Sequence, residues 1–266
     1  MFPMILSACR RLAGTLSVPV AALFLVLPGG AQALELPDLI ERVKPSVVVV
    51  GTYQRTRSPA FAMRGSGFVV GDGTLVATNA HVVPEVLDPS GGEALVIQVL
   101  AGREGGQQRA ARMVALDRPH DLALLRIDGA PLPPLALASG ATVREGEAVA
   151  FTGFPIGGIL GLSPVTHRGI VSAVTPIALP GGNAQQINEK VIRRLKSGTF
   201  DVYQLDATAY PGNSGGPLFE MRNGEVIGII NMVFVKGTKE AALSQPSGIS
   251  FAIPVHFLRE MLGNLK

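Results

Sequence analysis

The residues that can do chemistry gather around one serine. Ser214 stands in the stretch PGNSGGP, where three of its six nearest neighbours are glycines and two are prolines. Glycine leaves the backbone unobstructed, so Gly212 can adopt a conformation that brings its N–H and that of Ser214 to one point. The stretch predicts a nucleophile, Ser214, with an oxyanion hole built from Gly212, Asn213 and Ser214. A glycine-rich turn with an incidental serine is the alternative.

A serine nucleophile needs a base and an acid that orients the base. His81 lies in VATNAHVVP, at the end of an expected strand, and Asp121 lies in RPHDLALLRI, at the start of an apolar one. A half-buried carboxylate at Asp121 needs a partner, which the Nδ1–H of His81 would supply. Ser214 would then pass its proton to His81 Nε2 as it attacks a carbonyl. The order along the chain predicts the catalytic triad His81, Asp121 and Ser214.

Other readings of these residues fit less well. The stretch GNSGG also matches the G-x-S-x-G elbow, but an elbow serine is followed by a helix, whereas Pro217 begins an expected strand. The only histidine after Ser214 is His256, which lies in an amphipathic helix at the end of the chain. His120 is adjacent to Asp121 and therefore points to the opposite strand face, so we expect it at the surface. The four histidines show no zinc spacing, and we expect neither a metal nor a cofactor.

Short β-type runs separated by turn residues must position the triad. Six runs precede residue 130: Val47–Tyr53, Gly65–Val70, Leu75–Thr78, Ala94–Leu100, Arg109–Leu116 and Leu122–Ile127. Six more follow residue 140: Ala148–Gly153, Val165–Val174, Val202–Asp206, Pro217–Phe219, Val226–Val235 and Ile249–Ile253. The proline-rich stretch Asp128–Gly140 is typical of a semi-rigid linker between two units.

Periodic apolar residues predict helices at Leu36–Val43 and Val255–Leu262, and residues 183–198 are expected to form a helical surface insertion. We therefore predict an all-β fold of two six-stranded antiparallel β-barrels with short N- and C-terminal helices.

The N-terminus has the features of a secretory signal peptide. Arg10 and Arg11 precede a 16-residue apolar run, Leu12–Leu27, and Ala31-Gln32-Ala33 follows it, so we expect cleavage after Ala33. A membrane span takes about 20 apolar residues; an uncleaved anchor is the alternative, and membrane association is expected only in that case. The predicted organisation is a signal peptide (1–33), an N-terminal helix with the first barrel (34–130), and a linker, second barrel and C-terminal helix (131–266).

Composition narrows the class of protein. A hydrophobic content of 47% favours a packed chain, and a net charge of +3 without a basic block argues against nucleic acid as a partner. The only cysteine lies at position 9, within the expected signal peptide. The mature chain is therefore predicted to be an exported protein without disulfides.

Several segments together resemble the chymotrypsin-like serine proteases, and within them the HtrA/Deg family of exported proteases. They are GSGFVV, VATNAHVV, HDLALLRI, GFPIG, VTHRGIVSAV, QLDATAYPGNSGGPLF, GEVIGII and GISFAIP, in family order over about residues 36–262. The resemblance implies a trypsin-like double barrel with His81, Asp121 and Ser214 in the cleft between the barrels. It also implies a periplasmic endopeptidase for unfolded or damaged polypeptides. A catalytically silent protease fold, used as a binding or chaperone-like module, is the competing hypothesis.

Three departures from the family pattern matter. The sequence stops at Lys266, so we expect no C-terminal PDZ domain. Tyr210 stands where the family usually has Asn, which affects either the activation loop or the pocket. Asn213 replaces the aspartate that pairs with a freed N-terminus in digestive proteases, so activation by such a cleavage is not expected.

The resemblance bounds specificity and assembly only loosely. The predicted substrate pocket comprises Thr208, Ala209, Tyr210, Pro211, Ile230, Asn231 and Met232. No acid stands at Thr208, so a small or medium apolar residue is expected at the cleaved position rather than Arg or Lys. Family members often trimerise, and a homotrimer and a monomer both remain open.

Overall fold

The computed structural model of the chain describes residues 35–88, 90–100, 106–140, 143–156, 161–176, 200–232 and 248–265. Residues from Ala33 to Lys266 form one compact unit. The predicted signal peptide and the predicted insertion at 183–198 lie outside the described residues. Among the helices that are described, none has the length and apolar character needed to cross a bilayer.

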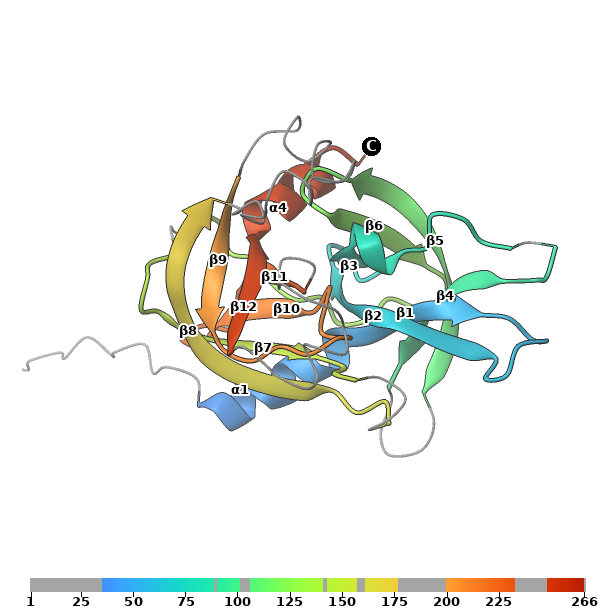
Figure 1. The fold of residues 1–266 in the computed structure, drawn as a ribbon, viewed down its shortest axis with the longest axis horizontal. Coiled ribbons are helices and arrows are strands. Elements are labelled where there is room, and N and C mark those ends of the chain that lie inside the picture. The colour runs from blue at the N-terminus through green and yellow to red at the C-terminus, as the bar shows by residue number, and fades with distance from the viewer. Residues whose placement is uncertain are drawn as a thin grey trace, which may run out of the picture. The chain divides into compact units, whose positions relative to one another are not determined.

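The first half of the chain forms a closed antiparallel barrel (Figure 1). Its order is β1-β2-β3-β6-β5-β4, and β4 closes the barrel by pairing with β1. The strands are β1 (Val47–Tyr53), β2 (Phe61–Val70), β3 (Leu75–Asn79), β4 (Ala94–Val99), β5 (Gln107–Asp117) and β6 (Leu122–Ile127).

The second half repeats this architecture in the order β10-β11-β12-β9-β8-β7, closed by pairing of β7 with β10. The strands are β7 (Ala148–Gly153), β8 (Val165–Pro176), β9 (Asp201–Asp206), β10 (Pro217–Glu220), β11 (Val226–Asn231) and β12 (Ile249–Pro254). The predicted fold of two six-stranded antiparallel barrels is confirmed.

Strands β1, β3 and β6 are almost wholly buried, because both of their faces are covered. In β1, Val47 and Val49 join an apolar cluster that continues into the second barrel, whereas Val48 and Val50 join a cluster confined to the first barrel. Successive strand side chains point to opposite faces, so four consecutive valines serve two cores.

The linker between the barrels hydrogen-bonds to both of them. Leu132 N–H donates to the carbonyl of Gly73, in the β2–β3 turn, at 2.9 Å. Ala138 N–H donates to the carbonyl of Val226, in β11, at 2.9 Å. Linker residues Leu135, Ala138 and Val143 are buried in the shared apolar cluster. The linker therefore fixes the two barrels to each other as well as connecting them.

Within the described part of the chain, two α-helices flank the barrels. Helix α1 (Leu36–Val43) buries Leu39 and Val43, and ends where Pro45 removes a backbone donor. Although α1 precedes the first barrel, its Arg42 Nη2 donates to the carbonyl of Asn223 in the β10–β11 turn at 2.7 Å. Helix α4 (Val255–Gly263) follows β12 directly and buries one face, formed by Val255, Leu258 and Met261.

Strand limits differ from the predicted ones chiefly where pairing extends beyond the core. β2 begins at Phe61 rather than Gly65, because residues 61–63 pair with the end of β1 while their side chains are only half-buried. β11 ends at Asn231, and residues 233–247 lie outside the described part of the chain. Residues 61–63 are apolar, but the exposed Arg64 separates them from the apolar run that begins at Gly65.

Candidate active site

His81 and Asp121 lie together at one end of the first barrel. His81 belongs to the short 3₁₀ turn η2 (Ala80–Val82), which follows β3, and Asp121 ends the turn between β5 and β6. His81 Nδ1 is 2.7 Å from Asp121 Oδ2, and the His81 backbone N–H donates to Asp121 Oδ1 at 2.9 Å. Two contacts to one carboxylate fix both the ring and the main chain of the histidine. The contact favours the tautomer with a proton on Nδ1, which leaves Nε2 free to accept one.

The Asp121 carboxylate is buried, with 8% of the residue exposed. It receives a further hydrogen bond across the barrel interface, from Asn231 Nδ2 to Oδ2 at 2.6 Å. Asn231 is fully buried at the end of β11. The resemblance placed Asn231 in the substrate pocket and missed this contact with the acid. A buried carboxylate with three such donors is satisfied without solvent.

Ser214 comes from the second barrel, in the loop that leads into β10. The residue is 6% exposed, and its Oγ accepts a hydrogen bond from Met232 N–H at 3.2 Å. Among the described residues its Oγ forms no hydrogen bond with His81. Catalytic contacts of this kind are often long in enzymes without substrate and shorten when the substrate binds.

The N–H groups of Gly212 and Ser214 point away from the hydrogen bonds that hold the serine loop. The Pro211 carbonyl accepts from Ile156 N–H at 2.7 Å, and the Asn213 carbonyl accepts from Gly216 N–H at 2.9 Å. Because a trans peptide holds C=O and N–H on opposite sides, the N–H groups that follow these carbonyls point the other way. Within the described residues neither N–H has an acceptor. Two unpaired N–H donors beside a serine are what an oxyanion hole requires, so both remain candidates for that role.

Ser66 links this loop to the first barrel. Its Oγ donates to the Gly212 carbonyl at 2.7 Å and accepts from Phe154 N–H at 3.0 Å. Its backbone N–H donates to the Ser214 carbonyl at 2.8 Å. Ser66 lies in β2 and is fully buried. One side chain of the first barrel thus fixes the loop that carries the candidate nucleophile.

Two glycines of the loop are required for steric reasons. Gly212 has φ +103°, and a Cβ there would collide with the Phe154 carbonyl oxygen. Gly215 has φ +86°, and a Cβ there would collide with the Ser66 carbonyl oxygen and Thr78 Oγ1 of the first barrel. At Gly215 the two barrels therefore approach each other closely.

Tyr210 contacts a histidine that the sequence reasoning left aside. Its ring centroid is 6.1 Å from that of His167 in β8, which also stacks on Phe151 at 4.9 Å. His167 Nε2 is buried and has no hydrogen-bond partner within the described part of the chain. Burial lowers the pKa of His167 below its usual value of 6.5. Tyr210 thus packs against a histidine that is kept neutral.

The predicted pocket residues lie on both sides of Ser214 in the sequence. Part of their packing is visible: Ala209 N–H donates to Ser250 Oγ at 2.8 Å, and that hydroxyl donates to the Ala207 carbonyl at 2.6 Å. Their role in substrate binding remains a prediction.

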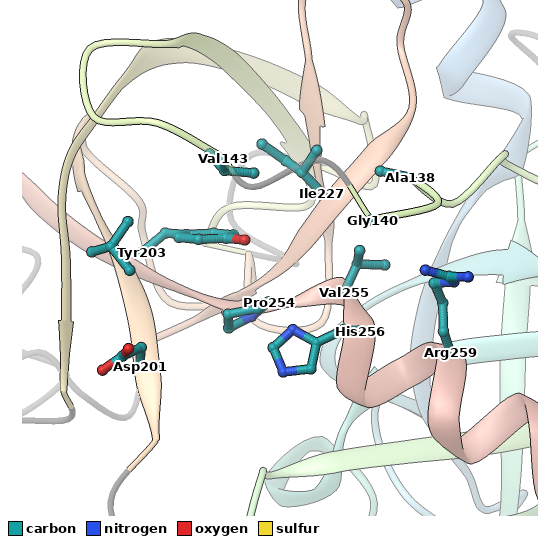
Figure 2. Close-up of a pocket in the computed structure, with 11 residues that line it drawn as sticks. Ala138, Gly140, Val143, Asp201, Tyr203, Ile227, Pro254, Val255, His256 and Arg259 are labelled. Carbon is teal, nitrogen blue, oxygen red and sulfur yellow. The ribbon is translucent and has the colours of Figure 1, made fainter.

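A pocket of about 280 Å³ lies elsewhere on the second barrel (Figure 2). Its apolar wall includes Val143 and Ile227, with Arg259 on the α4 side and Tyr203 on the β9 side. Burial raises the pKa of Tyr203 to about 12, with the Glu147 carboxylate adding to the effect. None of the lining residues belongs to the predicted triad, oxyanion hole or substrate pocket.

His120 is not the surface residue that strand alternation predicts. Its side chain is 26% exposed, its Nδ1 is 2.7 Å from Asp117 Oδ2, and its ring stacks on Phe257 at 3.8 Å. The alternation argument fails because Asp121 has φ +54°, so the chain turns between the two residues instead of continuing as a strand. Within the described ranges no three His, Cys, Asp or Glu side chains are grouped as metal ligands.

Comparison with known proteins defines the class. The model of the trypsin-like peptidase domain matches residues 65–229, and the chain belongs to this family. It is 28% identical to a "Probable periplasmic serine endoprotease DegP-like" of Hahella chejuensis, over 98% of this chain and 55% of the relative. It is 33% identical to "Serine protease HTRA1A" of Danio rerio, over 85% of this chain and 40% of the relative. The chain spans about half the length of the curated relatives it matches.

Solved structures of HtrA-type proteases are also similar to this chain. An HtrA-type protease, AlgW, with a tripeptide superposes with a TM-score of 0.60 and 26% identity, over 86% of this chain and 63% of that one. The serine endoprotease from Yersinia pestis gives a TM-score of 0.59 and 26% identity, over 87% of this chain and 66% of that one. The resemblance to the HtrA/Deg proteases is confirmed.

Proposed function

We propose that this chain is an exported serine endopeptidase that cleaves unfolded or damaged polypeptides through an acyl-enzyme. The observation that carries the proposal is the 2.7 Å contact between His81 Nδ1 and Asp121 Oδ2. It leaves His81 Nε2 as a base, next to a serine loop with two free N–H donors. Membership of the trypsin-like peptidase family supports the same chemistry.

Each residue has a defined role in the proposed reaction. Ser214 Oγ attacks the scissile carbonyl while His81 Nε2 accepts its proton, and Asp121 stabilises the imidazolium. The N–H groups of Gly212 and Ser214 bind the oxyanion of the tetrahedral intermediate. His81 then protonates the leaving amine, and water hydrolyses the acyl-enzyme by the same steps in reverse order.

Casein hydrolysis and labelling by a fluorophosphonate test this proposal. We expect label at Ser214 by peptide mapping, and we expect Ser214→Ala and His81→Ala each to lower turnover by about 10⁴- to 10⁶-fold. Ser172→Ala, at an exposed serine of β8, is the matched control and should retain turnover. Near wild-type rates in both triad variants would refute the assignment. An unlabelled Ser214 without casein cleavage would favour the silent binding module.

The proposal includes export to the periplasm with cleavage after Ala33. Its support is the charged start and apolar run of the leader, together with the word "periplasmic" in the name of the Hahella chejuensis relative. N-terminal sequencing of the protein from a periplasmic extract should give Leu34 as the first residue. A first residue of Met1, or recovery only from the membrane fraction, would contradict it.

The substrate and assembly parts of the proposal have separate tests. We expect cleavage after small or medium apolar residues in unfolded chains, which mapping of the casein fragments measures. Frequent cleavage after Arg or Lys would contradict the assigned pocket. The mass in solution distinguishes the two assemblies that remain open, a homotrimer and a monomer.

A further inference from the structure

The candidate catalytic acid sits in a turn with an unusual backbone. Asp121 adopts φ +54°, in the left-handed region, where Asp is tolerated but not preferred. Its N–H donates to the Arg118 carbonyl at 3.2 Å, and its own carbonyl accepts from Ala80 N–H at 3.0 Å and Asn79 Nδ2 at 3.1 Å. These contacts hold the turn to the first barrel. These contacts do not explain what holds the turn to the second barrel, whose Asn231 donates to the Asp121 carboxylate.

The residue directly before Asp121 makes that connection. The Asp117 carboxylate receives both the backbone N–H of His120, at 3.1 Å, and His120 Nδ1, at 2.7 Å. This pair fixes the ring plane from within the turn. The other side of the ring contacts aromatic residues of the second barrel.

Two phenylalanines enclose the His120 ring. Phe257, in α4, stacks on it with centroids 3.8 Å apart and planes at 20°. Phe200, the residue before β9, meets it edge-on at 4.7 Å and 68°. The two phenylalanines also pack edge to face at 5.1 Å, and the His256 ring lies 3.9 Å from Phe257. Partial burial lowers the pKa of His256.

We propose that His120 is a positioning residue for Asp121: it ties the β5–β6 turn to Phe257 and Phe200, and so holds the acid where the two barrels meet. Adjacent Cα atoms are about 3.8 Å apart, so no flexible segment separates the tie from the acid. Asp121 must satisfy His81 of the first barrel and Asn231 of the second at the same time. A turn held from one barrel only would let these two contacts drift independently. The inference rests on the proposed role of Asp121 as the catalytic acid.

Three substitutions distinguish the proposed link from His120 to Phe257 and Phe200 from a general packing effect. His120→Ala removes the ring and its contact with Asp117, while His120→Phe keeps the stack and loses only that contact. Phe257→Leu removes the aromatic partner and keeps apolar bulk, which guards against a variant that does not fold. Arg118→Ala is the matched control, because Arg118 lies in the same turn and its exposed side chain pairs with exposed Glu85.

Kinetics on a short unstructured peptide give the first readout. We expect His120→Ala to lower kcat about tenfold with KM changed less than twofold, because the acid is displaced while the substrate contacts remain. Phe257→Leu should give a smaller loss of kcat, and His120→Phe should recover most of it. Arg118→Ala should match the wild type. Unchanged kcat in both His120→Ala and Phe257→Leu, measured below their melting temperatures, would overturn the proposal.

Proton NMR supplies a readout that does not depend on turnover. The proton between His81 Nδ1 and Asp121 should give a downfield signal in the wild type, broadened in His120→Ala and retained in Arg118→Ala. If the wild type hydrolyses nothing but the signal changes as stated, the proposed function fails and the positioning role stands. A signal unaltered in His120→Ala refutes the positioning role even in an active enzyme.

Discussion

The serine loop depends on one hydroxyl of the other barrel, and Ser66→Ala removes it. Ser66 Oγ is the donor to the Gly212 carbonyl and the acceptor for Phe154 N–H. Alanine keeps the β2 backbone and its 2.8 Å contact with the Ser214 carbonyl, so the change is confined to these two hydrogen bonds.

The expected loss follows from the burial of the two partners. Phe154 is 1% exposed, so its orphaned N–H costs about 1–3 kcal/mol. Gly212 is half-buried, so water partly replaces its bond and the loss is about 1 kcal/mol. We expect unfolding free energy to fall by about 2–4 kcal/mol. Freed from Ser66, the Gly212 peptide loses its fixed direction. A tenfold fall in kcat, equal to about 1.4 kcal/mol, is expected, less than the ~10²–10³ for losing an oxyanion donor outright.

Urea unfolding and peptide hydrolysis measure the two effects. Ser46→Ala is the matched control: Ser46 is also fully buried, yet its Oγ has no hydrogen-bond partner in the described part of the chain. Removing an unsatisfied buried hydroxyl relieves its desolvation cost, so Ser46→Ala should raise the unfolding free energy, by at most about 1–3 kcal/mol, and leave kcat unaltered. Equal stability and equal kcat in the two variants would show that Ser66 does not hold the loop.

Three further outcomes follow from the described geometry. Gly212→Ala should lower kcat by about 10²–10³-fold, because its Cβ would meet the Phe154 carbonyl. Gly248 also has a positive φ, +70°, but lies in open space, so Gly248→Ala adds only backbone strain and should leave kcat unchanged. Burial lowers the pKa of His167, so the stability that its neutral form contributes is present above pH 6.5 and is lost as the pH falls below that value. His167→Phe should therefore reduce the fall in melting temperature between pH 7 and pH 5. An equal fall in the variant and the wild type would refute this role of His167. Tyr203 has a pKa of about 12, so it should add no tyrosinate absorbance until the pH approaches that value. If the wild type shows tyrosinate absorbance at a lower pH and Tyr203→Phe lacks it, the burial of Tyr203 is contradicted.

Much of the fold can be predicted from the sequence because many of the strands, such as β1, β6 and β7, carry an apolar run of their own. The limits of β1, β6 and β7 follow directly from runs bounded by turn residues. The long β8 and the outer part of β2 are less legible, since their ends are held by backbone pairing and their side chains reach solvent. Periodicity reports burial, so it cannot report a strand end that is not buried.

The candidate site also contains residues that the sequence predicts and residues that it does not. Local backbone chemistry marks Ser214 through its glycines, and its order with His81 and Asp121 points to a triad. Asn231 lies 110 residues from Asp121, and only the packing of the two barrels against each other brings them together. Ser66 carries no local signal either, because its partners Gly212 and Phe154 belong to the other barrel.

The packing of α1 sets an order for folding. Arg42 and the carbonyl it binds, in Asn223, are 181 residues apart, and Leu39 is buried in the apolar cluster shared with the second barrel. Helix α1 therefore lacks this docking site until β10 and β11 have paired. Closing so long a loop is slow and depends on everything between. A protease added during refolding should cut 36–43 until the second barrel is complete, so protection of α1 would time the last step of assembly.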